Sequence, residues 1–335
     1  SSLKILITGC AGFVGRAVLA HLQPLGFEIR GIDLTDPGIP GVDFRTANLQ
    51  EADSLMPHCE GVDAILHLAG IPGPALPATD LFSLNCAGTF NLFNAAAATG
   101  VKRVVVASSI HAIGYFFGPK AFELSHLPVK EDHPKFTTDS YSFTKQITED
   151  IADYFWRRDG ISSSCMRFGA GWHNPQITRE AEIAAYVAAK ERATYLAALP
   201  QAESAALINA AQAEFDQLRA DRAFEGKTSY VKAFSDPDLK LIWMKHTYFS
   251  YVDLSDACQA MELGLRANYE GSYSLFVVHE NNILHQDAAT LARLFYPTVA
   301  DQNKLEHNQS FLSGDKAAAL IGFRATTPPD RLLVP

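Results

Sequence analysis

The chain opens with an aliphatic run that passes through a glycine-rich turn into an amphipathic stretch. Residues 3–8 read Leu-Lys-Ile-Leu-Ile-Thr, which is typical of a buried β-strand, and residues 13–23 carry apolar side chains at helical spacing. Between them stand three glycines, Gly9, Gly12 and Gly15. A strand that turns into a helix through closely spaced glycines presents the amide groups of the helix N-terminus to an anion. This start predicts an α/β fold with a phosphate-binding loop.

Strand and helix patterns alternate along the first half of the chain. Further strands are expected at about 28–33, 63–67, 102–107 and 162–167, and helices near 13–23, 50–56, 79–99 and 140–158. Such alternation predicts a parallel, doubly wound α/β sheet of the Rossmann type with right-handed crossovers. Because 47% of the 335 residues are apolar, the chain can bury a sizeable core.

The second half predicts a smaller, discontinuous, partly helical substrate domain. Residues 179–198 and 201–222 are rich in Ala, Glu, Gln and Leu, so we expect a helical insertion of two helices, broken by Pro200. The insertion caps a cleft, makes a subunit contact or, as its amphipathic pattern favours, covers core. A βα pattern returns at 249–257, and a strand is expected at 272–278. The expected boundaries are 1–170 for the Rossmann domain, which the chain re-enters at about 245–257 and 270–280, and 171–244 with 281–335 for the substrate domain.

An aspartate at the end of the second predicted strand indicates which dinucleotide is bound. Asp33 stands where a carboxylate can accept both hydroxyl groups of an adenosine ribose, and a negative charge there repels a 2′-phosphate. No arginine follows among Leu34, Thr35 and Asp36 to bind such a phosphate. The glycine loop and Asp33 together predict NAD as the cofactor rather than NADP. Arg16, just after the loop, is expected either to contact a phosphate or to be solvated or helix-packing.

A tyrosine and a lysine four residues apart, Tyr141 and Lys145, form a candidate acid–base pair. On a helix this spacing places both side chains on one face, so the ammonium group can lie near the phenol. A free phenol has a pKa of about 10, and adjacent positive charge favours the phenolate, which can accept a proton from a substrate hydroxyl group. Ser109, at the end of a predicted strand, would hydrogen-bond the same oxygen, with Ser108 as the neighbouring alternative. Either motif alone is common in ordinary helices and turns, and their occurrence together behind a dinucleotide loop makes the prediction specific.

These motifs resemble those of the extended short-chain dehydrogenases/reductases, a family that includes nucleotide-sugar epimerases, dehydratases and uronate dehydrogenases. The resemblance runs through nearly the whole first half and returns at 249–257 and 272–278. Its landmarks are the glycine loop, Asn48-Leu49, His67-Leu68-Ala69-Gly70, Asn85-Cys86-Ala87-Gly88-Thr89, Ala107-Ser108-Ser109, Tyr141-Ser142-Phe143-Thr144-Lys145 and Arg167-Phe168-Gly169. It implies that Asn48 and Leu49 lie near adenine and that Leu68, Ala69 and Gly70 line the pyrophosphate side. The residues expected to contact NAD are Gly9, Gly12, Phe13, Val14, Gly15, Asp33, Leu34, Asn48, Leu49, Leu68, Ala69, Gly70, Asn85, Tyr141 and Lys145.

Other expectations concern packing and assembly. Asn85 is expected either to pack a helix or to join the active-site hydrogen-bond network, and Arg167 to form a structural ion pair. The resemblance also implies a homodimer in which the helices near 79–99 and 140–158 pair with those of a second copy.

The segment after Ser109 narrows the substrate class. Residues 109–114 read Ser-Ile-His-Ala-Ile-Gly and lack the Asp-Glu pair that dehydratases of the resembling family carry there, which disfavours a 4,6-dehydratase. The segment is more similar to that of uronate dehydrogenases, which also carry a histidine at the position of His111. We expect substrate contacts from Ser109, Ile110, His111 and Phe168.

Residues 243–246 bear on the same question. Nucleotide-sugar enzymes of this type tend to place an arginine shortly before the Tyr-Val-Asp segment to hold the diphosphate; residues 245–249 lack one, though Lys245 and His246 could substitute. A uronate enzyme would need a cation for the carboxylate, and Trp243-Met244 stands where that cation would be sought. The resulting prediction is NAD-dependent oxidation of a hydroxyl group on a sugar or sugar derivative. The alternatives are a nucleotide-sugar epimerase that retains its NAD and a non-catalytic dinucleotide sensor.

Composition argues against several other classes. The formal net charge is −9 and no dense Lys/Arg block occurs, so neither nucleic acid nor an anionic membrane is an expected partner. The sequence has no run of about eighteen apolar residues, and its N-terminus lacks the features of a signal peptide, so we expect a soluble, cytoplasmic protein. The five cysteines are scattered and odd in number, which predicts reduced, buried thiols, and no Cys/His cluster has metal-ligand spacing.

Overall fold

A seven-stranded parallel sheet lies at the centre of the molecule, with the strand order β3-β2-β1-β4-β5-β6-β7. The computed structural model describes residues 2–70, 73–170, 179–225 and 235–330. The strands are β1 (Lys4–Thr8), β2 (Glu28–Asp33), β3 (Asp43–Thr46), β4 (Ala64–His67), β5 (Arg103–Ala107), β6 (Ser162–Phe168) and β7 (Ser272–Val277). Because the strand order reverses between β1 and β4, the predicted doubly wound α/β sheet is confirmed. The domain boundary expected at residue 171 falls outside the described residues.

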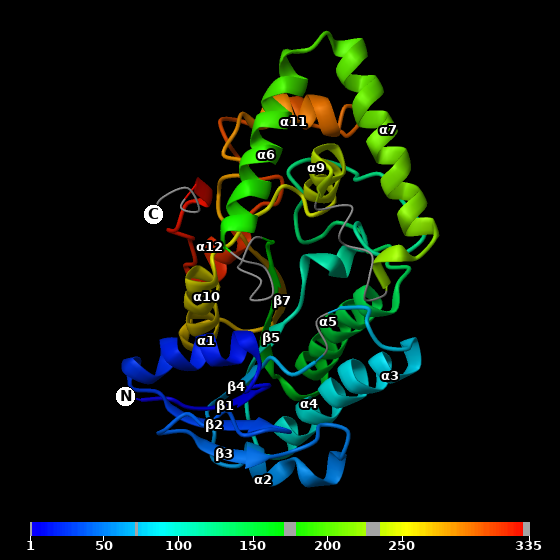
Figure 1. The fold of residues 1–335 in the computed structure, drawn as a ribbon. Coiled ribbons are helices and arrows are strands. Elements are labelled where there is room, and N and C mark those ends of the chain that lie inside the picture. Colours follow the sequence, from blue (N-terminus) through cyan, green and yellow to red (C-terminus); the bar gives the residue numbers. More distant parts are fainter. Residues whose placement is uncertain (1, 71–72, 171–178, 226–234, 331–335) are drawn as a thin grey trace.

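Helices cover both faces of the sheet because its strands are apolar on both sides. Along β1, Ile5 and Ile7 pack on one side and Leu6 on the other, as alternation in a strand requires. The first side is covered by α1 (Phe13–Leu22), α10 (Leu254–Arg266) and α12 (Asp315–Ile321), and the second by α4 (Gly88–Ala98) and α5 (Ser140–Asp159), with α3 (Ala78–Phe82) packed beside α5, as Figure 1 shows.

Two helices predicted in the first half are interrupted. The expected helix at 79–99 is split by a π-helical turn, η3 (Ser83–Ala87), between α3 and α4. Such turns within helices are frequent at functional sites. The expected helix at 50–56 is only a 3-10 turn, η2 (Ala52–Ser54), followed by α2 (Met56–Cys59). Pro57 lies in the first turn of α2, and because a proline has no backbone N–H it cannot continue a helix from upstream.

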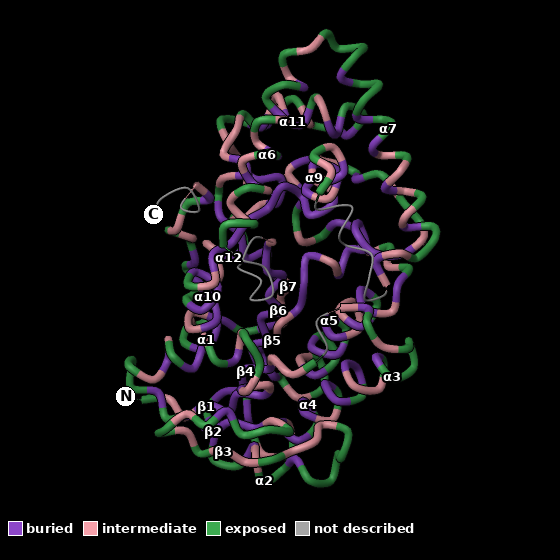
Figure 2. The backbone as a smooth tube through the Cα atoms, in the orientation of Figure 1, coloured by how far each residue is buried: buried purple, intermediate pink, exposed green. Residues whose placement is uncertain are grey.

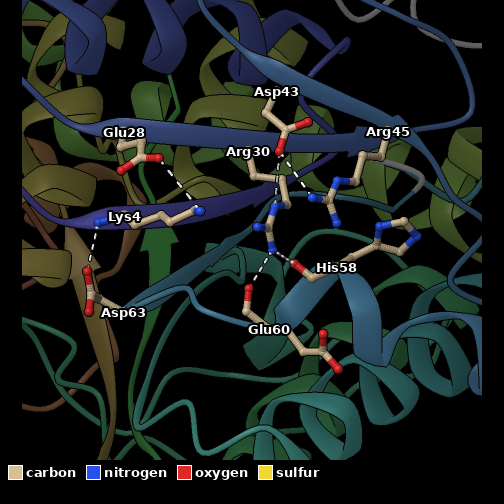
Figure 3. A network of polar contacts seen from close by, with 8 residues as sticks. All are labelled: Lys4, Glu28, Arg30, Asp43, Arg45, His58, Glu60 and Asp63. Carbon is tan, nitrogen blue, oxygen red and sulfur yellow. Dashed lines mark hydrogen bonds and ion pairs between the residues drawn. The ribbon is translucent and has the colours of Figure 1, made fainter.

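Strand β3 was not expected, because its four residues include a single apolar side chain, Phe44. Figure 3 shows what holds it beside β2. The buried guanidinium of Arg30 donates to the backbone oxygens of His58 and Glu60, at 2.8 Å each, and lies 3.4 Å from the carboxylate of Asp43. One arginine therefore joins β2, β3 and the end of α2.

The helical insertion forms a hairpin of α6 (Arg179–Ala198) and α7 (Gln201–Ala220), with Pro200 before the second helix as predicted. In Figure 1 the hairpin straddles α9 (Pro237–His246) and α11 (Ala288–Phe295). The buried side chains of α7 recur every three to four residues and are Ser204, Ile208, Ala211, Phe215 and Arg219. Apolar members of this stripe belong to the same hydrophobic core as Tyr141, so the insertion covers core. Helices α9, α11 and α12 were not predicted, since each has ten residues or fewer.

Burial follows the layers of the fold. The backbone is buried through the central strands and around α9, whereas the outer side of the hairpin is exposed (Figure 2). The remaining short turns are η1 (Gln23–Leu25), η4 (Ile110–Ile113), η5 (Ala223–Glu225) and η6 (Gln302–Lys304). All five cysteines are free and buried, as expected. Among the described residues, no helix combines the length and apolarity needed to cross a bilayer, and no three His, Cys, Asp or Glu side chains converge as metal ligands.

Candidate active site

The predicted site residues gather at one edge of the sheet. Parallel strands all end at the same edge, and ligands of open α/β sheets bind outside it where the strand order reverses. Six strands, taken in their order across the sheet (β3, β2, β1, β4, β5 and β6), end at or just before predicted residues. In that order these residues are Asn48 and Leu49, Asp33 and Leu34, Gly9 to Gly15, Leu68 to Gly70, Ser109 to His111, and Phe168. Asn85 lies in η3, and Tyr141 and Lys145 lie on α5.

The three positions of the glycine loop require glycine for different structural reasons. Gly9 has φ +71°, and a Cβ there would lie 2.7 Å from the backbone nitrogen of Ala69. A Cβ at Gly15 would overlap the carbonyl oxygen of Gly9, so both positions are dictated by close backbone approach. At Gly12 the nearest atom to a Cβ would be 3.4 Å away, and the residue is exposed. Since no described side chain caps α1, its first amide groups are open to an anion at Gly12.

The carboxylate of Asp33 ties β2 to the glycine loop. Its Oδ2 accepts a hydrogen bond from the backbone nitrogen of Ala11 at 3.0 Å, and Oδ1 accepts one from Leu34 at 2.7 Å. Both oxygens keep lone pairs for further donors. The guanidinium of Arg16 donates to the backbone oxygens of Ala11 and Pro37, at 3.0 Å each, so Arg16 packs against the glycine loop, and its other expected role, a phosphate contact, stays a prediction.

The turn after β3 packs against α4. The side-chain oxygen of Asn48 accepts from the backbone nitrogen of Gln50 at 3.0 Å, and the backbone oxygen of Leu49 accepts from Asn91 at 2.8 Å. Gly88 permits this approach, because a Cβ there would lie 3.2 Å from that of Leu49. The turn is therefore fixed at the edge where adenine is expected.

Tyr141 and Lys145 are brought together on the inner face of α5. The ammonium group of Lys145 donates to the backbone oxygen of Ala107, the last residue of β5, at 2.9 Å, and lies 5.8 Å from the centre of the Tyr141 ring. Burial lowers the pKa of Lys145 to about 8. The tyrosine is 6% exposed. An ammonium group fixed this close to a phenol ring favours the phenolate over the neutral form.

The two serines after β5 point in different directions. Ser108 donates its hydroxyl proton to Oε2 of Glu149 at 2.6 Å, inside the protein. The Ser109 hydroxyl oxygen instead accepts from the backbone nitrogen of His111 at 3.0 Å, at the start of η4. Within the described part of the chain, no acceptor takes the Ser109 proton. Of the two serines weighed from the sequence, Ser109 is the one with a proton to offer a ligand.

Beneath Ser108 lies the ion pair expected for Arg167. Its Nε and Nη2 donate to the two carboxylate oxygens of Glu149 at 2.9 and 2.8 Å, and Lys135 lies 2.8 Å from Oε1. Burial on its own would raise the pKa of Glu149, but the hydrogen bonds and charges of Arg167 and Lys135 bring it to about 2. Both partners of the pair are at most 2% exposed. The pair locks α5 to β6 directly below the Tyr141–Lys145 face.

A second buried network starts from the first strand. His67 Nδ1 lies 2.6 Å from the Thr8 hydroxyl and Nε2 lies 2.8 Å from the Thr89 hydroxyl. Thr89 donates its own proton to the backbone oxygen of Asn85 at 2.6 Å, so we assign the Nε2–H tautomer, in which Nδ1 accepts from Thr8. Burial and the charge of Lys145 lower the pKa of His67 to about 3, which keeps the ring neutral.

Asn85 belongs to this network rather than only to helix packing. Its amide nitrogen donates to the Thr144 hydroxyl at 3.2 Å, which in turn donates to the backbone oxygen of Tyr141 at 2.7 Å. Gly70, with φ +148°, leaves room for the Asn85 amide, since a Cβ there would lie 3.1 Å from its oxygen. The π-helical turn thus connects the loop after β4 to the start of α5.

Aromatic rings line the part of the site where substrate contacts are expected. His111 packs its ring 4.8 Å from that of Phe117 and 6.2 Å from that of Tyr141, measured between ring centres. Desolvation lowers the pKa of His111 to about 4, so the ring is neutral near pH 7. Ile110 is 2% exposed and lies in the same core as Tyr141, and Phe168 is 7% exposed at the end of β6.

The two basic residues near Trp243 that could hold a diphosphate, Lys245 and His246, both make hydrogen bonds within the protein. Lys245 donates to the side-chain oxygen of Gln212 at 2.8 Å, and His246 is bonded to the same glutamine at 3.0 Å, so both belong to packing between α7 and α9. A different cation, Lys240, places its ammonium group 5.6 Å from the centre of the Trp243 ring, and burial lowers its pKa to about 8.

Comparison with known proteins identifies the family. Residues 5–191 match the model of the NAD dependent epimerase/dehydratase family. The chain belongs to this family. A uronate dehydrogenase from Pseudomonas syringae pv. tomato is 31% identical over 180 residues, which are 52% of this chain and 62% of that protein. An L-arabinose 1-dehydrogenase (NAD(P)(+)) from Haloferax volcanii is 27% identical over 195 residues, 56% of this chain and 76% of that protein.

Solved structures share the fold of this chain. A short-chain dehydrogenase/reductase superfamily protein from Agrobacterium tumefaciens, solved with bound NAD, superposes with a TM-score of 0.62 at 23% identity, covering 98% of this chain and 94% of that one. A likeness at this identity bears on the fold alone. The two relatives named above are sugar dehydrogenases by name, and the match covers 62% and 76% of their lengths.

Sequence reasoning missed several residues that shape the site. Glu149 follows Lys145 by four residues and Tyr141 by eight, so helical periodicity could have placed it on the same face of α5. The roles of Thr8 and Thr89 depend on β1, β4 and α4 lying side by side, which no local pattern reveals.

Proposed function

We propose that this protein is an NAD-dependent oxidoreductase that removes a hydride from a hydroxyl group of a sugar or sugar derivative. Tyr141 is the general base, Lys145 favours its phenolate, and Ser109 orients the reacting hydroxyl group. The observation that carries this proposal is the Lys145 ammonium group, held by Ala107 beside the Tyr141 ring at the edge where the glycine loop opens.

The residues at this edge fit NAD. The open first turn of α1 at Gly12 would receive the pyrophosphate, and the carboxylate of Asp33 would accept the ribose hydroxyl groups. Asn48 and Leu49 would lie beside adenine, and Leu68 to Gly70 beside the pyrophosphate. When bound, NAD supplies the hydride acceptor.

The protein's own residues handle the proton. As the hydride leaves the substrate carbon, Tyr141 would take the proton of the reacting hydroxyl group, and Ser109 would donate its uncommitted proton to the same oxygen. Lys145 supplies positive charge beside the phenol, and its ammonium group donates to the backbone oxygen of Ala107. His111, neutral near pH 7, would face the substrate with a ring that can donate or accept.

The alternative is a nucleotide-sugar epimerase that uses the same hydride step reversibly and retains its NAD. Tight NAD in the purified protein without net NADH formation would favour it. A dinucleotide sensor would bind NAD and turn over no sugar. Net reduction of added NAD with one sugar of a panel of free sugars, uronates, sugar phosphates and nucleotide sugars supports the dehydrogenase.

We also propose a second copy of the chain as a partner, with α3, α4 and α5 at the interface. Four aromatic residues on these helices, Phe82, Phe90, Phe143 and Tyr154, are 38–44% exposed. They stack in two pairs, with ring centres 6.2 Å apart for Phe82 and Phe143 and 6.0 Å apart for Phe90 and Tyr154. Large aromatic rings exposed together on neighbouring helices are typical of a protein–protein interface.

Replacing the proposed base tests the function directly. Tyr141→Phe removes one oxygen and keeps the ring, so turnover should fall roughly a hundred- to ten-thousand-fold while NAD affinity stays nearly unchanged. Tyr154→Phe is the matched control, because it removes a phenol oxygen from the exposed end of the same helix. Turnover is measured as NADH formation with the best sugar of the panel. If Tyr141→Phe keeps more than about a tenth of wild-type turnover, Tyr141 is not the general base.

A further inference from the structure

The C-terminal end of α7 is hydrogen-bonded to the loop 114–120, which lies against Tyr141. Arg219, in the last turn of α7, is 2% exposed. Its guanidinium donates to backbone oxygens of a single short segment, residues 114–120. The acceptors are Gly118 and Tyr115 at 2.9 Å, Phe117 at 3.0 Å, and Gly114 and Lys120 at 3.3 Å.

A guanidinium group is suited to this task. A buried cation is costly unless its donors are satisfied, and the planar fork of an arginine carries five N–H donors where a lysine carries three on one atom. The carbonyl groups of 114–120 must turn inward to reach one centre. Positive φ angles of +88° at Gly114 and +94° at Gly118 permit this curl. Residues 114–120 are thereby wrapped around Arg219.

The wrapped segment carries the aromatic rings of the site. Phe117 meets the Tyr141 ring edge-on at 5.9 Å and the His111 ring at 4.8 Å. Phe116 packs on the other side, 5.6 Å from Phe215 of α7 and 4.5 Å from Trp243 of α9. A shift of this segment would move Phe117 away from Tyr141 and His111.

Helix α7 reaches the same segment through a second path. The Nδ1 of His246 donates to the backbone oxygen of Tyr115 at 2.7 Å, the oxygen that Arg219 also contacts. The other ring nitrogen, Nε2, then accepts from the amide nitrogen of Gln212 on α7 at 3.0 Å. Two α7 side chains therefore converge on one carbonyl group.

We propose that Arg219 is a positioning residue: by holding residues 114–120 it sets the Phe117 ring beside Tyr141 and His111, and so fixes the wall of the substrate site. The inference rests on the proposed function for its effect on turnover, but not for its effect on the segment. Helix α7 lies beyond residues 5–191, the part of the chain that matches the family. The wall is therefore shaped by a helix outside the matched region.

The test compares Arg219→Lys and Arg219→Met with the control Arg222→Met, which removes an arginine whose side chain is 60% exposed and pairs with Glu225. Hydrogen exchange of peptides spanning 114–120 reports on the segment, and NAD titration reports on the fold of the cofactor site. Losing the guanidinium contacts should speed this exchange and lower kcat/KM by about tenfold or more, mainly through KM, with NAD affinity within about twofold. Arg222→Met should leave all three unchanged.

Each outcome decides the proposal. Wild-type exchange of 114–120 in the Arg219 variants refutes it. Faster exchange with unchanged kcat and KM shows that Arg219 only stabilises the fold, and this also refutes it. If neither Arg219 variant folds, Phe117→Leu replaces them in the test. This variant should bind NAD normally and have a raised KM, and unchanged kinetics overturn the proposal. If the wild type oxidises no sugar, the proposed function fails, while the exchange comparison still decides whether Arg219 holds the segment.

Discussion

The buried pair of Glu149 and Arg167 permits a quantitative prediction for Glu149→Gln. The glutamine keeps the shape of the side chain but has one oxygen where Glu149 uses two, so either the Arg167 Nε and Ser108 or the Arg167 Nη2 and Lys135 lose their acceptor. Two cations also lose their negative partner. Removing one member of a buried ion pair costs about 3–5 kcal/mol of stability.

The pKa of Glu149 gives an independent estimate. Its fall from 4.5 to about 2, at about 1.4 kcal/mol per pH unit, corresponds to about 3 kcal/mol of stability at neutral pH. Because the folded pKa lies below the unfolded one, this contribution is complete well above pH 4.5 and is lost as the pH falls towards 2. By about pH 3.5 the wild type should have lost about 1 kcal/mol relative to the variant.

Urea unfolding followed by circular dichroism at pH 7, 5, 4 and 3.5 measures both effects. A domain of ordinary stability, about 5–15 kcal/mol, retains a folded population after this loss. The control is Glu28→Gln, whose pair with Lys4 is 3.6 Å long and largely exposed (Figure 3), so about 0.5 kcal/mol or less is expected. A Glu149→Gln loss below about 1 kcal/mol, or a difference from wild type that does not shrink between pH 5 and 3.5, refutes the reasoning.

Three further predictions concern the cofactor, the proton path and assembly. NAD should bind more tightly than NADP, and Asp33→Ser should narrow the gap between the two dissociation constants; equal wild-type constants contradict the role given to Asp33. Lys145→Ala should lower both turnover and NAD affinity, whereas Ser109→Ala should lower turnover less than Tyr141→Phe, as steady-state kinetics and NAD titration would measure; a fully active Lys145→Ala rules out the proposed role. Phe143→Glu should convert a dimer into monomers in light scattering, and a wild type that is already monomeric at micromolar concentration excludes the interface.

Local patterns predicted what local geometry determines. The loop at Gly9 to Gly15 follows from a strand that turns straight into a helix, and the pairing of Tyr141 with Lys145 follows from helical spacing. The ion pair of Arg167 was expected, but its partner was not, because Glu149 meets it only when α5 lies over β6.

Features that depend on contacts distant in sequence were missed. Arg219 donates to an oxygen 101 residues earlier in the chain, so the amphipathic pattern of α7 gives no sign of its role. Strand β3 pairs with β2 and is tied to it by Arg30, while only Phe44 of its side chains packs on the core; Asn85 in the π-helical turn is hydrogen-bonded to Thr89 and Thr144. Residue type and spacing carry no information about such partners.

The late arrival of β7 has a consequence for how the protein is made. Strand β7 pairs with β6 across an excursion of roughly a hundred residues (169–271), and α10, which packs on the same sheet face as α1, lies near the end of that excursion. During synthesis, β1 to β6 and α1 to α5 therefore emerge while β6 has no partner on its β7 side and while α10 and α12 are still missing from the sheet face that α1 covers. Until Ser272–Val277 leaves the ribosome, that side of β6 stays open to pairing with other chains, so truncated products that end inside the α6–α7 hairpin should aggregate more readily than products that include β7.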